Sequence, residues 1–286
     1  METFVHIGCH KTGTTYLQNL LAANLSLLSR EGVGYLPLSE LRGDIIPKAI
    51  SCEHPLGYIK SRISTSGHDN LRSILLSDEN IIGTCSEFVS TGVAYPNAEH
   101  KLKRIFRDSD KVVFFMCIRR PSDFIVSAWA EAIRFRSYVG LDNFTNLVKN
   151  RGFSWFSVVR RIKDIIGENK LFVWTYENNE FGVDYLIEKL TKARLLRSDL
   201  VAPNEVAGRS SMSQEGYDLL YLMDKLLGRD VVIKYSKAVA RSATTGPSMK
   251  KNLLLPANVS SKWDDEYLVD LDKIREIPGV SIVHSI

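Results

Sequence analysis

The chain has 286 residues, of which 44% are hydrophobic and 24% are charged, and its formal net charge is +4. This length allows one large core, or one core with a smaller appended lobe, and the composition is ordinary for a globular protein. The small positive charge argues against a nucleic-acid-binding protein and is consistent with an enzyme whose substrates are anions.

The first residues lack the basic segment and apolar stretch of a signal peptide, and no apolar run approaches the roughly 18–20 residues of a membrane helix. The cysteines are scattered, with no C-x-x-C pair and no histidine at metal-ligand spacing; they are Cys9, Cys52, Cys85 and Cys117. This pattern predicts reduced, mostly buried thiols rather than disulfides or a metal site. We therefore expect a cytoplasmic protein with no metal and no membrane association.

Short apolar runs alternate with segments of helical period, which is the pattern of a parallel α/β sheet. The predicted strands are 3–8, 33–36, 80–86, 111–118 and 170–176. The predicted helices are 16–30, 122–135, 154–166, 183–194, 213–227 and 263–275, with a capping box at Ser211–Gln214. Residues 228–262 have only weak periodicity. We predict one domain over 1–286, with a three-layer α/β/α core (1–177) around a five-stranded parallel sheet and a helical remainder (178–286).

The first predicted strand leads into the loop Gly8-Cys9-His10-Lys11-Thr12-Gly13-Thr14-Thr15, and a predicted helix follows. Backbone N–H groups in such a loop, together with the N-terminus of the helix, form an anion site. Gly8 and Gly13 permit tight backbone turns, while Lys11 adds a cation and the threonines add hydroxyls. Read alone, the segment is also compatible with a glycine-containing turn and an incidental lysine.

The position of Lys11 separates this loop from the nucleotide-triphosphatase P-loop, in which lysine directly follows the second glycine. Here Lys11 lies two residues before Gly13, and Thr14-Thr15 follows. The segment resembles the 5′-phosphosulfate loop of sulfotransferases that use 3′-phosphoadenylyl sulfate (PAPS), especially bacterial members. This resemblance implies that His10, Lys11, Thr12, Gly13, Thr14 and Thr15 bind the donor, in a sheet with the strand order 2-3-1-4-5.

A second segment, Cys117-Ile-Arg-Arg-Pro-Ser-Asp-Phe-Ile-Val-Ser127, carries the same resemblance. The family binds the 3′-phosphate of its donor with an arginine at a strand end and a serine eight residues later, which matches Arg119 and Ser127. A guanidinium and a hydroxyl are suitable partners for a phosphate dianion. The alternative is a surface Arg-Arg pair before a proline-initiated helix, and we expect that role for Arg120.

The resemblance implies in-line transfer of a sulfonate group, without magnesium, to a hydroxyl or amine acceptor. Lys11 would stabilise charge on the leaving 5′-phosphate of adenosine 3′,5′-bisphosphate. We expect Glu87, in a Ser-Glu pair at the end of the third predicted strand, to be the catalytic base, with His10 as the alternative. His6 is expected to be a packed strand residue, and Asp78 and Glu79 are expected to be solvated loop charges.

Residues 225–251 contain seven basic side chains and one acidic one: Lys225, Arg229, Asp230, Lys234, Lys237, Arg241, Lys250 and Lys251. They predict either a solvated basic surface or a groove for an anionic acceptor, to which Asn204 and Arg209 could contribute. By analogy with bacterial relatives we expect a small-molecule or glycan acceptor, most plausibly a carbohydrate. The rival interpretations are a small-molecule kinase using ATP and magnesium, and a non-catalytic nucleotide-binding protein. The sequence does not predict the oligomeric state.

Overall fold

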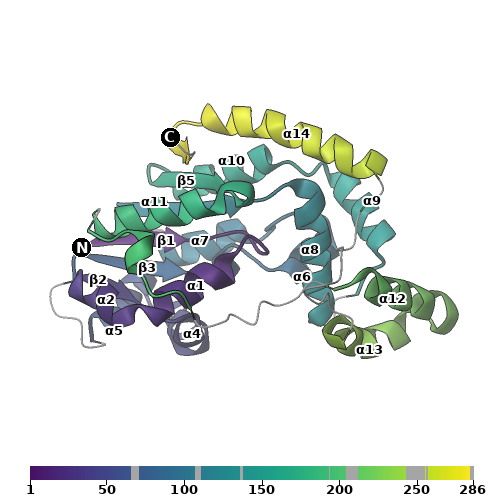
Figure 1. The fold of residues 1–286 in the computed structure, drawn as a ribbon, viewed down its shortest axis with the longest axis horizontal. Helices are drawn as coiled ribbons and strands as arrows, with labels where there is room; N and C mark the ends of the chain where they lie inside the picture. Colours follow the sequence, from purple (N-terminus) through teal and green to yellow (C-terminus); the bar gives the residue numbers. More distant parts are fainter. Residues whose placement is uncertain are drawn as a thin grey trace.

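The computed structural model describes residues 1–65, 71–106, 111–135, 138–192, 194–203, 212–242, 255 and 257–283. Its centre is one sheet in which every neighbouring pair of strands is parallel, in the order β2-β3-β1-β4-β5-β6. The strands are β1 (Glu2–His6), β2 (Val33–Tyr35), β3 (Ser73–Ser77), β4 (Val112–Ile118), β5 (Lys170–Thr175) and β6 (Val280–Ile282). The predicted α/β class with a parallel sheet is confirmed (Figure 1).

The third predicted strand, 80–86, is wrong, because the strand beside β1 is formed by Ser73–Ser77. All five residues of the observed strand Ser73–Ser77 are buried. In the following segment, Asp78 accepts a hydrogen bond from the Asn80 amide (2.8 Å) and begins a 3₁₀ turn at Glu79–Ile81. Thr84 then caps the next helix, so local side-chain bonds take the backbone out of the extended conformation.

The predicted count of five strands is also wrong, because Val280–Ile282 adds a sixth strand beside β5. The predicted helix 16–30 is two helices, α1 (Thr14–Ala23) and α2 (Leu25–Arg30), that meet at Asn24. The Asn24 amide nitrogen donates to the carbonyls of Leu20 and Val201, at 2.8 Å each. This contact ties the end of α1 to a distant segment of the chain.

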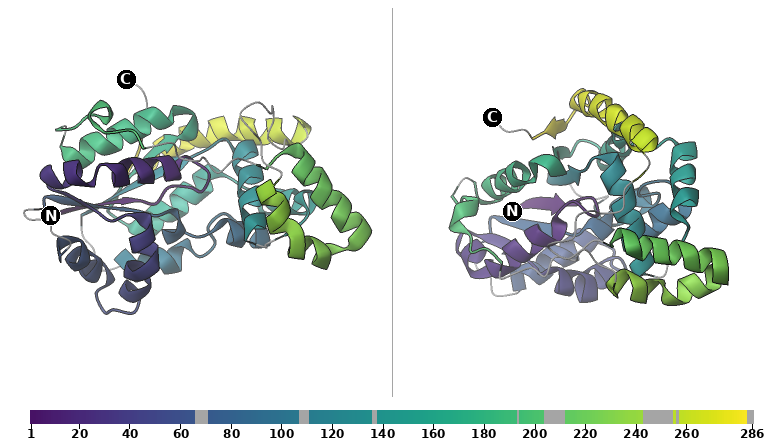
Figure 2. Two further views of the ribbon diagram at one scale, coloured as in Figure 1. Left: turned by 60° about the horizontal axis from the view of Figure 1, so that its bottom comes forward. Right: turned by 45° about the vertical axis from the view of Figure 1, so that its right-hand side comes forward.

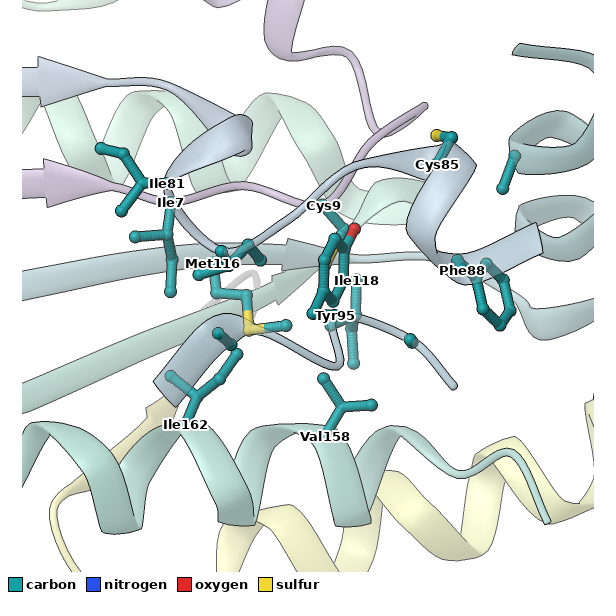
Figure 3. Close-up of a cluster of buried hydrophobic side chains, with 14 of the residues drawn as sticks. Ile7, Cys9, Ile81, Cys85, Phe88, Tyr95, Met116, Ile118, Val158 and Ile162 are labelled. Atoms are coloured by element: carbon teal, nitrogen blue, oxygen red, sulfur yellow. The ribbon is translucent and has the colours of Figure 1, made fainter. Parts of the chain in front are cut away.

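Helices cover both faces of the sheet. Successive side chains of a strand point to opposite faces, and they pack into two separate hydrophobic cores. Phe4, Phe115 and Trp174 pack on one face against α1 and α11 (Asn179–Thr191). Val5 and Phe114 pack on the other face, which α7 (Ala98–Phe106) and α10 (Trp155–Ile166) cover. Figure 3 shows part of this second core, including Tyr95 near Cys9 and Ile118.

Several helices lie beyond the carboxyl ends of the strands (Figures 1 and 2). The remaining helices of the first part are α3 (Leu38–Glu40), a π-helical turn (Leu41–Ile45), α4 (Ile46–Ala49), α5 (Pro55–Thr65), α6 (Cys85–Thr91), α8 (Pro121–Arg134) and α9 (Leu141–Arg151). Short 3₁₀ turns occur at Glu79–Ile81, Tyr176–Asn178 and Arg197–Asp199. The helices α6 and α8 pack against each other and cover the carboxyl edge of the sheet near the first loop.

The C-terminal region contains α12 (Gln214–Leu227), α13 (Arg229–Ser242) and α14 (Ala257–Arg275). The predicted helices 183–194, 213–227 and 263–275 correspond to α11, α12 and α14, whereas α13 was not predicted. Ser213 is the N-cap of α12, and Ser211 lies outside the described residues. Among the helices described, none combines the length and apolar character needed to cross a bilayer.

Candidate functional site

The loop between β1 and α1 has three residues in the left-handed region, with φ of 37° at Gly8, 65° at Lys11 and 79° at Gly13. A Cβ on Gly8 would lie 2.6 Å from the methyl carbon of Thr14, so only glycine is accommodated. The Thr12 hydroxyl donates to the Cys9 carbonyl at 2.5 Å and holds the turn closed. α1 begins at Thr14, so its N-terminus lies directly behind the loop.

Arg119 joins this loop to the second motif. It follows β4, and its Nη1 donates to the Lys11 carbonyl (3.0 Å) and to the Ser127 hydroxyl (3.4 Å). Its guanidinium carbon lies 4.7 Å from the centre of the Tyr176 ring. Its buried Nε has no hydrogen-bond partner within the described part of the chain. The two predicted donor-binding segments therefore meet at one guanidinium.

The Lys11 ammonium is 3.4 Å from a carboxylate oxygen of Glu131 on α8, which sequence reasoning missed. The Glu131 side chain is only 8% exposed, and Arg134 approaches it at 3.7 Å. Glu131 lies one helical turn after Ser127, so the i,i+4 spacing was a signal that could have identified it. α8 thus places a hydroxyl beside Arg119 and a carboxylate beside Lys11.

Glu87 does not follow a strand. It occupies the first turn of α6, where its carboxylate accepts from the Thr84 backbone amide (2.6 Å) in a capping box. Lys101 forms an ion pair with it at 3.3 Å, and Asn97 donates to it at 2.9 Å. Burial opposes its charged form, but these donors outweigh burial and lower the pKa of Glu87. The strand-end position on which its predicted role rested is therefore wrong.

The residues that do follow β3 are Asp78, Glu79 and Asn80, and the expectation that these two acids are solvated is wrong. Asp78 is 2% exposed, and the Glu79 side chain is 13% exposed. Arg42 binds both carboxylates, at 2.6 Å to Asp78 and 3.0 Å to Glu79. Gln18 donates to the other oxygen of Glu79 at 3.0 Å. Two buried acids and one guanidinium thus lie at the carboxyl end of the strand beside β1.

Burial opposes the ionised form of Glu79, but the nearby His10 ring and the Arg42 guanidinium outweigh it and lower the pKa of Glu79. His10 itself is 9% exposed, and its Nε2 lies 3.0 Å from the amide oxygen of Asn80. Its backbone N–H donates to the Tyr95 hydroxyl at 3.0 Å. Burial lowers the pKa of His10, and the nearby Glu79 carboxylate and the hydrogen bond with Asn80 oppose this shift. His10, itself a residue of the first loop, links that loop to the segment that follows β3.

His6 is packed inside the sheet, as expected. Its Nδ1 lies 2.9 Å from the Ser77 hydroxyl, and its ring stacks on Trp174. Burial lowers the pKa of His6 to about 4. Glu177, which follows β5, accepts from the Arg120 backbone amide (3.0 Å) and from the Tyr267 hydroxyl (3.3 Å).

A pocket of about 570 Å³ adjoins the first loop and is lined by Arg120, Asp123, Tyr176, Glu177, Asn178, Asn179 and Glu180. A Cβ on Gly13 would lie 3.1 Å from the Asn179 amide nitrogen, so the loop and this wall are in close contact. A second pocket of about 700 Å³ lies between α4 and α7 and reaches Asp78 and Asn80. A third pocket, of about 780 Å³, is lined by residues that include Glu2 and Lys111, at the opposite edge of the sheet from the loop.

This third pocket is not a candidate site, because ligands of open parallel sheets bind at the carboxyl ends of the strands.

Of the basic segment 225–251, the structure describes the end of α12 and all of α13, which packs on α8. Arg229 donates to the Tyr138 carbonyl at 3.0 Å. Lys250, Lys251, Asn204 and Arg209 lie outside the described residues.

Within the described residues, no group of three or more His, Cys, Asp or Glu side chains is arranged to hold a metal ion. Comparison with protein-family models, with curated proteins and with solved structures finds no match to this chain. Interpretation of the site therefore depends on its residues and their geometry.

Proposed function

We propose that this chain is a sulfotransferase that moves a sulfonate group from PAPS to a hydroxyl or amine acceptor. The observation that carries the proposal is the Arg119 guanidinium, which contacts the first loop at Lys11 and the second motif at Ser127. A nucleotide with phosphates at both its 5′ and 3′ positions requires two anion sites held at a fixed separation. The direct contact between the two motifs supports such an arrangement.

In this proposal the amides of the first loop and the N-terminus of α1 bind the 5′-phosphosulfate. Arg119 and Ser127 bind the 3′-phosphate, for which the buried and unpartnered Nε of Arg119 is an available donor among the described residues. We place the nucleoside in the pocket next to Gly13, because its lining includes the aromatic ring of Tyr176 and the amide group of Asn179.

Lys11 has two partners in this scheme. Without donor, its ammonium pairs with the buried Glu131 carboxylate. When donor is bound, we propose that Lys11 turns to the oxygen that bridges sulfur and the 5′-phosphate. The positive charge then stabilises the leaving phosphate as the sulfur–oxygen bond breaks.

The acceptor must lose a proton as its oxygen forms the new bond to sulfur. Glu79 is better supported than Glu87 as the base, because Glu79 follows the strand beside β1 and interacts electrostatically with His10 of the first loop. The acceptor proton passes to the Glu79 carboxylate, and adenosine 3′,5′-bisphosphate leaves. His10 is the alternative base, since it precedes Lys11 in the first loop and its Nε2 lies 3.0 Å from the amide oxygen of Asn80.

The acceptor is proposed to be a carbohydrate or another small hydroxyl compound. Of the two pockets near the loop, the one between α4 and α7 combines aliphatic side chains such as Ile46 and Ile105 with Arg42 and Lys101. Both cations are already paired with acids, so this wall does not by itself favour an anionic acceptor. A screen with radiolabelled PAPS across sugars, phenols, lipids and amines would identify the acceptor class.

Isothermal titration calorimetry provides the direct test of the donor. We expect adenosine 3′,5′-bisphosphate to bind without magnesium, and ATP with magnesium to bind much more weakly. Binding of ATP–magnesium alone would favour the kinase and overturn the sulfotransferase proposal. Donor binding without turnover on any acceptor class would favour a non-catalytic nucleotide-binding protein.

A further inference from the structure

The outer face of α12 carries a row of exposed leucines. Leu219, Leu222 and Leu226 are 47%, 53% and 77% exposed. Their spacing of three and four residues places them on one stripe of the helix. The inner face of α12 is already occupied, since Leu220 is fully buried and the Tyr217 ring packs on Trp129. The leucine stripe is therefore separate from the contacts that fold the protein.

The exposed charges beside this stripe have opposite signs at its two ends. Glu215 and Asp218 lie in the first half of α12, and Lys225 lies in its last turn. All three are exposed. Asp218 accepts from Gln214 within the same helix, and Lys225 lies over the Tyr221 ring. Within the described part of the chain, neither Asp218 nor Lys225 forms an ion pair.

We propose that α12 docks on α12 of a second copy of this chain, with the two helices antiparallel. A two-fold axis near Leu222 would place this residue opposite its own copy and Leu219 opposite Leu226. The same axis would bring Asp218 beside Lys225 of the other copy, twice in the dimer. A two-fold contact must be complementary to itself, and this stripe is complementary in both apolar pattern and charge.

The antiparallel direction follows from the charges. In a parallel pair, the acidic ends of both helices would meet and so would the basic ends, which is unfavourable. Stable interfaces bury about 1,200–2,000 Å² of accessible surface in total, and one pair of helices of this length buries a smaller area. We therefore expect a weak dimer that forms and dissociates with concentration. This inference does not depend on the proposed catalytic activity.

Sedimentation equilibrium from about 1 µM to 1 mM protein measures the association. We expect a monomer–dimer equilibrium in the full chain and at least a tenfold weaker dimer in Leu222→Glu. The control is Leu268→Glu on α14, because Leu268 is similarly exposed (63%) but lies on another helix. A monomer at every concentration overturns the proposal, and so does dissociation caused by the control variant.

A charge exchange tests the antiparallel register. Asp218→Lys and Lys225→Asp should each weaken the dimer, because each places like charges together. The double variant should recover most of the wild-type affinity, since it restores opposite charges across the two-fold axis. A double variant as weak as the single ones overturns this register. Binding of the monomer to vesicles of anionic lipid, with no dimer in solution, would assign the stripe to a membrane surface instead.

Discussion

At the scale of single residues, Arg119 has the largest number of distinct roles in the candidate site. It orients the Lys11 carbonyl, approaches Ser127 and lies over Tyr176. Its backbone carbonyl also accepts from the Trp155 indole at 2.6 Å, which fixes the start of α8. The neighbouring Arg120 lies on the surface, as expected, and its backbone rather than its side chain contacts Glu177.

This difference between adjacent arginines gives a matched experiment. Arg119→Ala should weaken binding of adenosine 3′,5′-bisphosphate by about 1.5–3 kcal/mol, which is roughly 10- to 150-fold, because charge-assisted hydrogen bonds to the 3′-phosphate are lost. Arg120 also lines the pocket proposed for the nucleoside, but its side chain is exposed, so Arg120→Ala should weaken binding much less than Arg119→Ala does. Calorimetry measures both constants. Equal effects of the two substitutions would exclude the proposed 3′-phosphate site.

Glu79 should determine the acidic side of the pH profile. Its pKa lies below the ordinary 4.5, so the carboxylate is ionised at neutral pH and accepts a proton only as the pH falls through the lowered pKa. Turnover should therefore be present above that pKa and lost below it. Glu79→Gln should reduce turnover by about 10²–10⁴-fold at all pH values. His10→Gln is the control for the base, and a larger loss in that variant would assign the role to His10.

At the scale of elements, the displacement of the third strand explains why the sequence pattern placed Glu87 at a strand end. The sequence pattern Asn80-Ile-Ile-Gly-Thr-Cys-Ser86 is apolar enough for a strand, and hydropathy does not register that Asp78 and Thr84 cap turns there. The strands and loops around Lys11 and Arg119 could be predicted, because apolar runs and glycine spacing are visible within a short stretch of sequence. Helical period could place Glu131 on the same face of α8 as Ser127, but it could not reveal that Lys11, which is distant in the sequence, is its partner.

The structural role of Glu87 is testable as a property of α6. Loss of a capping interaction costs about 0.5–2 kcal/mol, so Glu87→Ala, which removes the bond from the Thr84 amide to the N3 carboxylate of the capping box, should lower the free energy of unfolding by an amount in that range. Turnover per folded molecule should change little. Glu99→Ala is the control, because that exposed residue pairs only with Lys103 on α7 among the described contacts. A loss of turnover without a loss of stability would return Glu87 to the list of candidate bases.

At the scale of the whole molecule, one sheet contains strands from both ends of the described chain. β1 begins at residue 2, and β6 ends at residue 282 beside β5. The strand order can form only after long segments have been brought together, which is expected to make folding slow. Because β6 follows a predicted helical region and has only three residues, its local signal is weak, and pairing with β5 decides its conformation.

The same architecture makes the four cysteines chemically unequal. Burial raises the pKa of the Cys9, Cys85 and Cys117 thiols, while Cys52 is partly exposed. A thiol reagent should therefore modify about one cysteine quickly in the native protein and all four in denaturant, as mass spectrometry can count. Several fast modifications under native conditions would contradict the packing described here.

Cys52 is consequently a native attachment point for a single fluorophore, with no cysteine substitution required. It lies after α4, where its carbonyl accepts from Arg104 of α7, and both Arg104 and the preceding residue Ser51 line the pocket between these helices. A dye at this position would report opening or filling of that pocket in real time. The three slow thiols would simultaneously record, through their rate of modification, how often the interior opens to solvent.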